Sequence, residues 1–203
     1  MIFLIRHGET HGNAARIVQI PDIPLSPRGI AQAERLGRRL AGAGIARIIA
    51  SDLARARMTA ESVHRATGAR LAFDALLHER SFGDLRGTPY ADLDVDIFAP
   101  GYTPPNGESW EVFHARVDLA WGRVLEAAAA MEGHLAVVTH GLVCRSLASR
   151  HLCLPEDALV PERWENTSVT IVDSASPWRV SLMNCIAHLD GMADAPAANA
   201  GAA

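Results

Sequence analysis

The sequence predicts an α/β protein, a three-layer α/β/α sandwich with a mainly parallel central sheet. Short apolar runs alternate with segments of helical periodicity along most of the chain, and this alternation is typical of parallel sheets covered by helices. The runs have no polar face, as expected for strands buried on both sides. A chain of 203 residues with 49% hydrophobic residues can form one well-buried core. We expect a single domain over residues 1–190.

The first half of the chain contains three strands and two helices. Ser26 is a typical N-cap and Pro27 a typical first helical residue, and apolar residues follow them at helical spacing. Glycines end both helices, and β-branched residues mark the strands. The expected elements are a strand at 2–5, a helix at about 27–41, a strand at 45–50, a helix at 53–67 and a strand at 71–77.

The second half begins with a long irregular connection and then resumes the alternation. Residues 81–107 are rich in Gly, Pro and Asp, and such a long connection inside a compact domain is usually a binding loop. The tail at 191–203 is mostly Ala, Gly and Asn, and we expect little fixed structure there. The expected elements between them are a helix at 110–131, a strand at 135–139, a helix at about 142–152 and closing strands at 169–172 and 178–185.

Charge and cysteine content exclude several classes of protein. The net charge is −4 and the basic residues are scattered, so we expect neither nucleic acid nor a membrane as a partner. All 19 basic residues are arginines, which excludes a P-loop lysine and a lysine Schiff base. Three cysteines without a pairing pattern indicate reduced thiols and a cytoplasmic protein. The oligomeric state stays open, a homodimer included.

Reactive side chains follow four of the expected strands. Arg6 and His7 follow the first strand, Arg55 the second, Glu79 the third and His140 the fourth. Because the carboxyl ends of parallel strands share one edge of the sheet, we expect these side chains to converge. Arginine forks bind phosphate oxygens, a neutral imidazole can accept the phosphoryl group, and a carboxyl group can protonate the leaving alcohol. The pattern indicates phosphoryl transfer.

Four motifs also occur in the order found in one protein family. With them, the chain resembles the histidine phosphatase superfamily, in its phosphoglycerate mutase-like branch, over residues 2–185. The resemblance implies a phosphoglycerate mutase-like fold and a catalytic domain at 1–190. The motifs are Arg6-His7-Gly8-Glu9-Thr10 with Asn13, Ser51-Asp52-Leu53-Ala54-Arg55-Ala56, Glu79-Arg80-Ser81-Phe82-Gly83 and Thr139-His140-Gly141.

The resemblance implies a role for each motif. By the family pattern, His7 is the phosphorylated nucleophile and Glu79 the proton donor. The catalytic set is completed by Arg6, Arg55 and His140, and no cofactor is implied. The residues expected to contact the small phosphorylated substrate are Arg6, Asn13, Arg55, His140 and Gly141.

Two departures from the family pattern bear on the substrate. Gln19 stands where family members commonly have a pocket glycine. Residues 88–105 contain no arginine, whereas cofactor-dependent mutases carry basic residues there, and this favours a phosphatase. Tyr90, Phe98 and Tyr102 either line the substrate pocket or pack the loop.

The expected activity is hydrolysis of a phosphate monoester through a phosphohistidine, without a metal. A cofactor-dependent phosphoglycerate mutase is the alternative enzyme. A phospho-ligand binding module without turnover is the non-enzymatic alternative. A metal site formed by His7, Glu79 and His140 is a further alternative, because these residue types are common metal ligands.

Overall fold

A six-stranded sheet forms the centre of the computed structural model, which describes residues 1–192. The strand order is β3-β2-β4-β1-β5-β6. The first four strands in this order pair in parallel, β5 is antiparallel to β1, and β6 is antiparallel to β5. The sheet is therefore mostly parallel, as predicted. Its strands are β1 (Ile2–Arg6), β2 (Ile45–Ala50), β3 (Arg70–Phe73), β4 (His134–Thr139), β5 (Val169–Val172) and β6 (Val180–Cys185).

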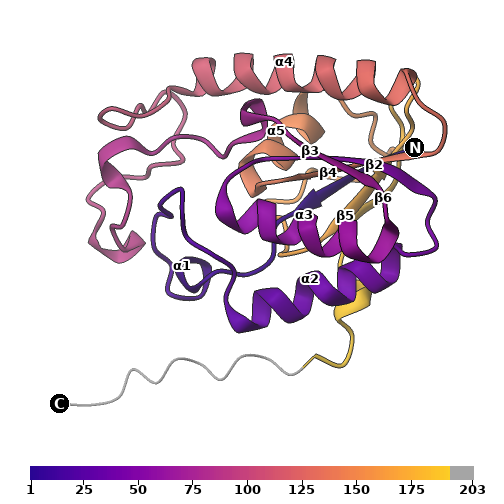
Figure 1. The fold of residues 1–203 in the computed structure, drawn as a ribbon. Helices are drawn as coiled ribbons and strands as arrows, with labels where there is room; N and C mark the ends of the chain where they lie inside the picture. The colour runs from indigo at the N-terminus through magenta and orange to yellow at the C-terminus, as the bar shows by residue number, and fades with distance from the viewer. Residues whose placement is uncertain (193–203) are drawn as a thin grey trace.

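Helices cover both faces of this sheet and complete three layers (Figure 1). One face packs against α2 (Pro27–Leu40) and α3 (Ala54–Thr67), and the other against α4 (Trp110–Ala129) and α5 (Gly141–Arg150). The strands alternate between the two cores: in β1, Ile2 and Leu4 belong to the α4/α5 core, and Phe3 and Ile5 to the α2/α3 core. The α/β/α prediction is confirmed. A short helix, α1 (His11–Ala14), follows β1.

One predicted strand is wrong in its second half. The strand expected at 71–77 ends at Phe73, and Ala75–Leu77 forms a 3₁₀ turn instead. The carboxylate of Asp74 causes this change, because it accepts a hydrogen bond from the backbone N–H of Leu76 at 2.9 Å. The turn buries Leu77 in the α4/α5 core. It thereby directs the following residues, Glu79 among them, toward the carboxyl edge of the sheet.

The long connection at 81–107 is folded around one buried arginine. Arg80 is 2% exposed, and its guanidinium stacks on the ring of Trp110 at 3.9 Å. It donates to the carbonyls of Ile97 at 3.1 Å and Tyr102 at 2.6 Å, and its Nε donates to the carbonyl of Glu108 at 3.1 Å. These bonds tie the middle and the end of the connection to the start of α4. The connection is therefore a structured wall beside the carboxyl edge of the sheet.

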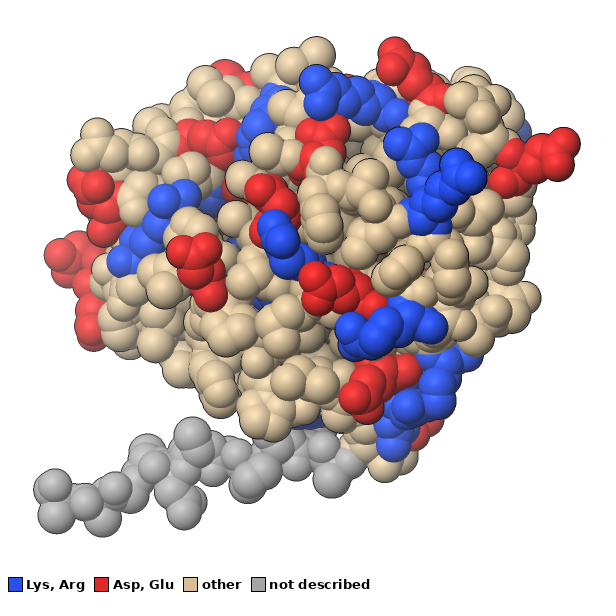
Figure 2. All heavy atoms as spheres, in the orientation of Figure 1, with Lys and Arg blue, Asp and Glu red and all other residues tan. Residues whose placement is uncertain are grey.

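Most of the tail expected at 191–203 lies outside the described residues, which end at residue 192. Within residues 1–192, no helix is long and apolar enough to cross a membrane. The face shown in Figure 2 carries arginines and acidic side chains interspersed, as the scattered sequence positions suggest.

Candidate active site

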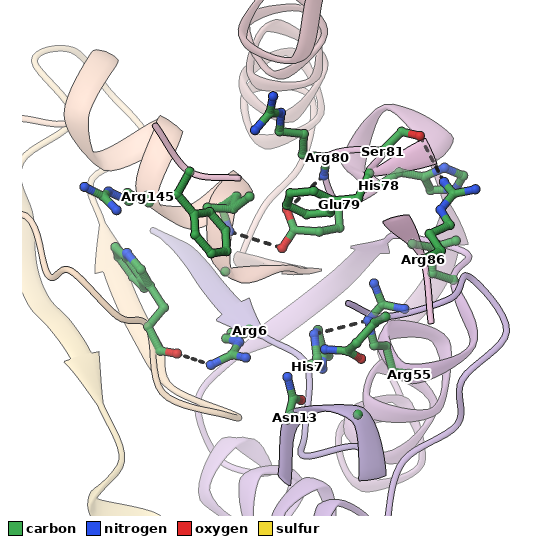
Figure 3. Close-up of a pocket in the computed structure, with 18 of the residues that line it drawn as sticks. Arg6, His7, Asn13, Arg55, His78, Glu79, Arg80, Ser81, Arg86 and Arg145 are labelled. Carbon is green, nitrogen blue, oxygen red and sulfur yellow. Dashed lines mark hydrogen bonds between the residues drawn. The ribbon is translucent and has the colours of Figure 1, made fainter. Parts of the chain in front are cut away.

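The strand-end residues converge around one pocket of about 970 Å³ (Figure 3). Arg6 ends β1, His7 follows it, Arg55 lies in the first turn of α3, and Glu79 follows the turn after β3. All four line the pocket. His140 caps α5 after β4 and is fully buried, with its ring centroid 5.1 Å from that of His7. The structure brings together all five residues that the sequence proposes as catalytic.

His7 is held as a neutral imidazole with a defined tautomer. Its Nδ1 lies 2.7 Å from the carbonyl oxygen of Gly8, which can only accept, so Nδ1 carries the proton. Nε2 is then unprotonated, and its lone pair accepts a hydrogen bond from Arg55 Nε at 3.3 Å. Burial, followed by the charges of Arg55 and Arg6, lowers the pKa of His7 well below 6.5. The imidazole therefore presents an uncharged nitrogen to the pocket.

Only one ring nitrogen of His140 has a hydrogen-bond partner among residues 1–192. Nε2 lies 2.8 Å from the hydroxyl of Ser51, and Nδ1 is buried without a hydrogen-bond partner in the described part of the chain. Burial, then the charge of Arg55, lowers the pKa of His140 well below its usual value. A buried polar atom without a partner is costly. Nδ1 is therefore a group that a bound ligand could satisfy.

Arg6 and Arg55 supply positive charge to the pocket. Both are buried, and both donate mainly to carbonyl oxygens: Arg6 to that of Trp164, and Arg55 to those of Ile20 at 3.2 Å and Pro21 at 3.4 Å. Burial lowers the pKa of Arg55 to about 10, so it stays cationic at neutral pH. Arg6 Nε is buried with no partner among residues 1–192. The pair is suited to an anion.

Glu79 is positioned by backbone donors. Its Oε1 accepts from the N–H of Arg80 at 3.0 Å, and its Oε2 from the N–H of Leu142 at 3.2 Å. Burial is the largest effect on this carboxyl group and raises its pKa, although the two hydrogen bonds oppose that shift. Arg116 fixes the backbone on which Glu79 sits, since it donates to the carbonyl of His78 at 2.8 Å. Because its pKa is raised, Glu79 keeps a proton to a higher pH than an ordinary glutamate does, which suits a proton donor.

Asn13 and Gly141, the remaining predicted contacts, also line the pocket. The side chain of Asn13 accepts from the N–H of Thr10 at 3.2 Å and from Asn166 Nδ2 at 3.3 Å. Gly141 begins α5 beside Arg6, where an added Cβ would lie 3.5 Å from Arg6 Nε. Both predicted residues are therefore at the pocket wall.

Three residues that contact Arg6, His7 or His140 escape sequence reasoning. Trp164 and Asn166 lie in an irregular segment before β5, and Asn166 Nδ2 donates to the carbonyl of His7 at 3.0 Å. No motif or periodicity marks them, because they reach the site only through the pairing of β5 with β1. Ser51 lies inside a quoted motif, but its contact with His140 depends on the tertiary fold.

The aromatic residues of the connection and Gln19 now have definite places. Tyr90 and Phe98 line the pocket, with ring centroids 6.0 Å apart, whereas Tyr102 packs within the loop. Gln19 also lines the pocket, and its Oε1 accepts from the hydroxyl of Thr10 at 2.9 Å. Within residues 1–192, no three His, Cys, Asp or Glu side chains are grouped so that they could hold a metal ion.

The fold and the site define a member of a known phosphoryl-transfer family. The family model described as the histidine phosphatase superfamily (branch 1) matches residues 2–185. The chain belongs to this superfamily.

The chain is similar in sequence and fold to proteins that carry different names. The chain is 35% identical to the probable phosphoglycerate mutase GpmB of Klebsiella pneumoniae, over 95% of this chain and 96% of the relative. The structure of YhfR from Bacillus stearothermophilus has a TM-score of 0.79 and 29% identity, covering 93% of this chain and 98% of that one. A putative alpha-ribazole-5'-P phosphatase from Escherichia coli has a TM-score of 0.75 and 27% identity, covering 88% and 94%. The names include a mutase and a phosphatase.

Proposed function

We propose that the protein is a metal-independent phosphate monoester hydrolase that works through a phosphohistidine at His7. The observation that carries the proposal is the neutral His7 Nε2, which faces a pocket with two buried guanidiniums and a carboxyl group of raised pKa. A nucleophile, charge stabilisation and a proton donor are the three needs of phosphoryl transfer.

In the first step, His7 Nε2 attacks the phosphorus atom and forms a P–N bond while the ester P–O bond breaks. Glu79 gives its proton to the departing alkoxide, which leaves as an alcohol. Arg6, Arg55 and His140 Nδ1 hold the phosphoryl oxygens as charge shifts onto them. Arg55 must exchange its contact with His7 Nε2 for a phosphate oxygen when substrate enters.

In the second step, water attacks the phosphorus atom and the P–N bond breaks. The Glu79 carboxylate takes a proton from this water, so the acid of the first step is restored as inorganic phosphate leaves. The products are an alcohol and phosphate, and the enzyme returns to its starting state.

Phosphoglycerate mutase is the second candidate, because relatives of about a third identity carry that name. A mutase would return the phosphoryl group from His7 to a sugar acid rather than to water. The two activities are separated by incubation with labelled 3-phosphoglycerate. Release of inorganic phosphate supports the hydrolase, and appearance of the isomer without phosphate release supports the mutase.

The decisive experiment is hydrolysis of p-nitrophenyl phosphate in the presence of excess chelator. We expect phosphate release by the unaltered protein, and no release and no acid-labile phosphate label in His7→Ala. His11→Ala, which changes an exposed histidine in α1, serves as the matched control. Loss of activity on addition of chelator contradicts metal independence, and label retained in His7→Ala places the nucleophile elsewhere. Phosphate binding without turnover would instead indicate a binding module.

A further inference from the structure

The pocket holds more positive charge than one phosphate group requires. Eight arginines and four acidic residues line it, although the whole chain has a net charge of −4. Two of the eight, Arg6 and Arg55, face the nucleophile, and two others are used in the fold, as described above for Arg80 and Arg116. We call the remaining four the rim arginines: Arg16, Arg86, Arg145 and Arg163.

The rim arginines come from four separate segments. One follows α1, one lies in the connection at 81–107, one is on α5 and one precedes β5. Figure 3 shows Arg86 and Arg145 on opposite sides of the pocket, with Arg6, His7 and Glu79 between them. The fold therefore gathers guanidiniums that are scattered in the sequence around one opening.

The acidic residues of the pocket are not paired with the rim arginines. Glu108 forms an ion pair with Arg116 at 2.7 Å, and the two carboxylate oxygens of Glu79 accept from the N–H groups of Arg80 and Leu142. Asp96 accepts from the N–H of Phe98 at 2.9 Å, and Glu162 is exposed. Within residues 1–192, no ion pair engages a rim arginine.

Two of the rim arginines also interact electrostatically with Arg6 and Arg55. The charge of Arg163 contributes to the lowered pKa of Arg6, and the charge of Arg86 contributes to that of Arg55, in both cases after burial. Like charges that interact in this way are unfavourable in the free protein. A ligand with a single phosphate, bound at His7, would neutralise the charge of Arg6 and Arg55 and leave that of the rim arginines.

We propose that the substrate carries a second anionic group, a carboxylate or a further phosphate, which the rim arginines bind while Arg6 and Arg55 hold the transferred phosphate. This inference rests on the proposed function and narrows its substrate class to small metabolites with at least two anionic groups. The volume of about 970 Å³ is much larger than one phosphoryl group and leaves room for such a molecule. Guanidinium forks bind carboxylates and phosphates with two parallel hydrogen bonds.

The exposure of the rim arginines decides which kinetic quantity they control. Their side chains are open to solvent, so each contact is weakened by water and by salt. Contacts of this kind act on encounter and binding more than on the chemical step. The second anionic group should therefore raise kcat/KM mainly through KM.

The test compares substrates that differ only in the second anionic group. One pair is 2-phosphoglycolate and 2-hydroxyethyl phosphate, and another is fructose 1,6-bisphosphate and fructose 6-phosphate. We expect the more anionic member to have a kcat/KM at least about tenfold higher, and this ratio to fall roughly fivefold in Arg145→Gln or Arg163→Gln. Arg65→Gln, an exposed arginine on α3 outside the pocket, should leave the ratio unchanged.

Two results would overturn the inference. A ratio near one for both pairs would mean that no second anionic group is recognised. A high ratio that stays the same in every rim variant, including Arg16→Gln and Arg86→Gln, would place recognition elsewhere. Hydrolysis of p-nitrophenyl phosphate is measured alongside: if the protein hydrolyses it and the ratios are near one, only this inference fails, whereas no hydrolysis of any ester contradicts the proposed function.

Discussion

Ser51 lies where its hydroxyl can set which nitrogen of His140 carries the proton. Its Oγ accepts from the N–H of Leu53 at 3.3 Å and lies 2.8 Å from His140 Nε2. When the hydroxyl donates to Nε2, the proton of the neutral ring is at Nδ1, the buried atom that has no partner in residues 1–192. Nδ1–H is then available to a phosphate oxygen. Ser51 acts through His140 and is in this sense a positioning residue.

Replacement of Ser51 by Ala should lower kcat. Without the hydroxyl, Nε2 loses its partner and the ring is free to hold its proton on the wrong nitrogen, so we expect a loss of roughly tenfold. Ser51→Thr keeps a hydroxyl and should restore most of the rate. Thermal unfolding of both variants separates a folding defect from a catalytic one. An unchanged kcat in Ser51→Ala would show that the tautomer of His140 does not depend on this contact.

The pH profile should report Glu79 on its basic side. Because its pKa is raised, Glu79 keeps its proton to a higher pH than an ordinary glutamate, and kcat/KM should fall as pH rises through that pKa. Because the pKa of His7 is lowered, the nucleophile stays neutral below pH 6.5. The fall of kcat/KM on the acidic side of the profile therefore moves to lower pH. In Glu79→Gln we expect the basic limb to disappear, with a larger loss for alkyl phosphates than for p-nitrophenyl phosphate. Equal losses for both substrates would argue against an acid role.

At the scale of elements, α2 packs against the loop that follows His7. Gly29, in the first turn of α2, approaches so closely that an added Cβ would lie 2.0 Å from the carbonyl oxygen of Glu9. Glu9 also accepts a hydrogen bond at that oxygen from the N–H of Ser26, the N-cap of α2, at 2.9 Å. The start of this helix therefore sets the position of the loop after the nucleophile.

Gly29→Ala should disturb both stability and activity. The methyl group meets backbone rather than a flexible side chain, so we expect the free energy of unfolding to fall by about 2 kcal/mol or more, and kcat to fall with it as Gly8 and His7 shift. Gly42→Ala is the matched control, since a Cβ there meets nothing within 4 Å. Urea unfolding and hydrolysis rates check both variants. Full stability in Gly29→Ala would show that the helix and loop can separate at little cost.

The elements differ in how well sequence reasoning predicts them. Apolar runs and helix caps are local signals, and the helices α2 to α5 lie close to their predicted ranges. The strand predicted at 71–77 is wrong beyond Phe73 because the Asp74 side chain competes for backbone hydrogen bonds, which an apolar pattern does not reveal. The rule that strand ends converge correctly brings Arg55 and Glu79 to the pocket that His7 lines. The rule does not predict Trp164, Arg145 or Arg163, because these residues lie in a loop or a helix and not at the end of a strand.

At the scale of the whole molecule, the buried guanidiniums of the pocket repel one another and destabilise the folded protein when no anion is bound. Arg6 and Arg55 are both buried at this pocket, the charge of Arg6 lowers the pKa of Arg55, and the charge of Glu79 offsets them only in its ionised form. Removing such groups from water is costly unless an anion compensates them. A bound phosphate should therefore stabilise the folded chain as a whole, in addition to its role in catalysis.

Inorganic phosphate should raise the melting temperature of the intact protein. At a concentration of about 100 times Kd, linkage adds about 2.7 kcal/mol to the free energy of unfolding, which corresponds to a shift of roughly 5–11 °C for a chain of this size. Arg55→Met should melt at or above the temperature of the unaltered protein without phosphate, because a buried charge is gone, and should lose most of the shift. Arg65→Gln should keep it. An equal shift in Arg55→Met, measured by calorimetry, would mean that phosphate binds outside this pocket.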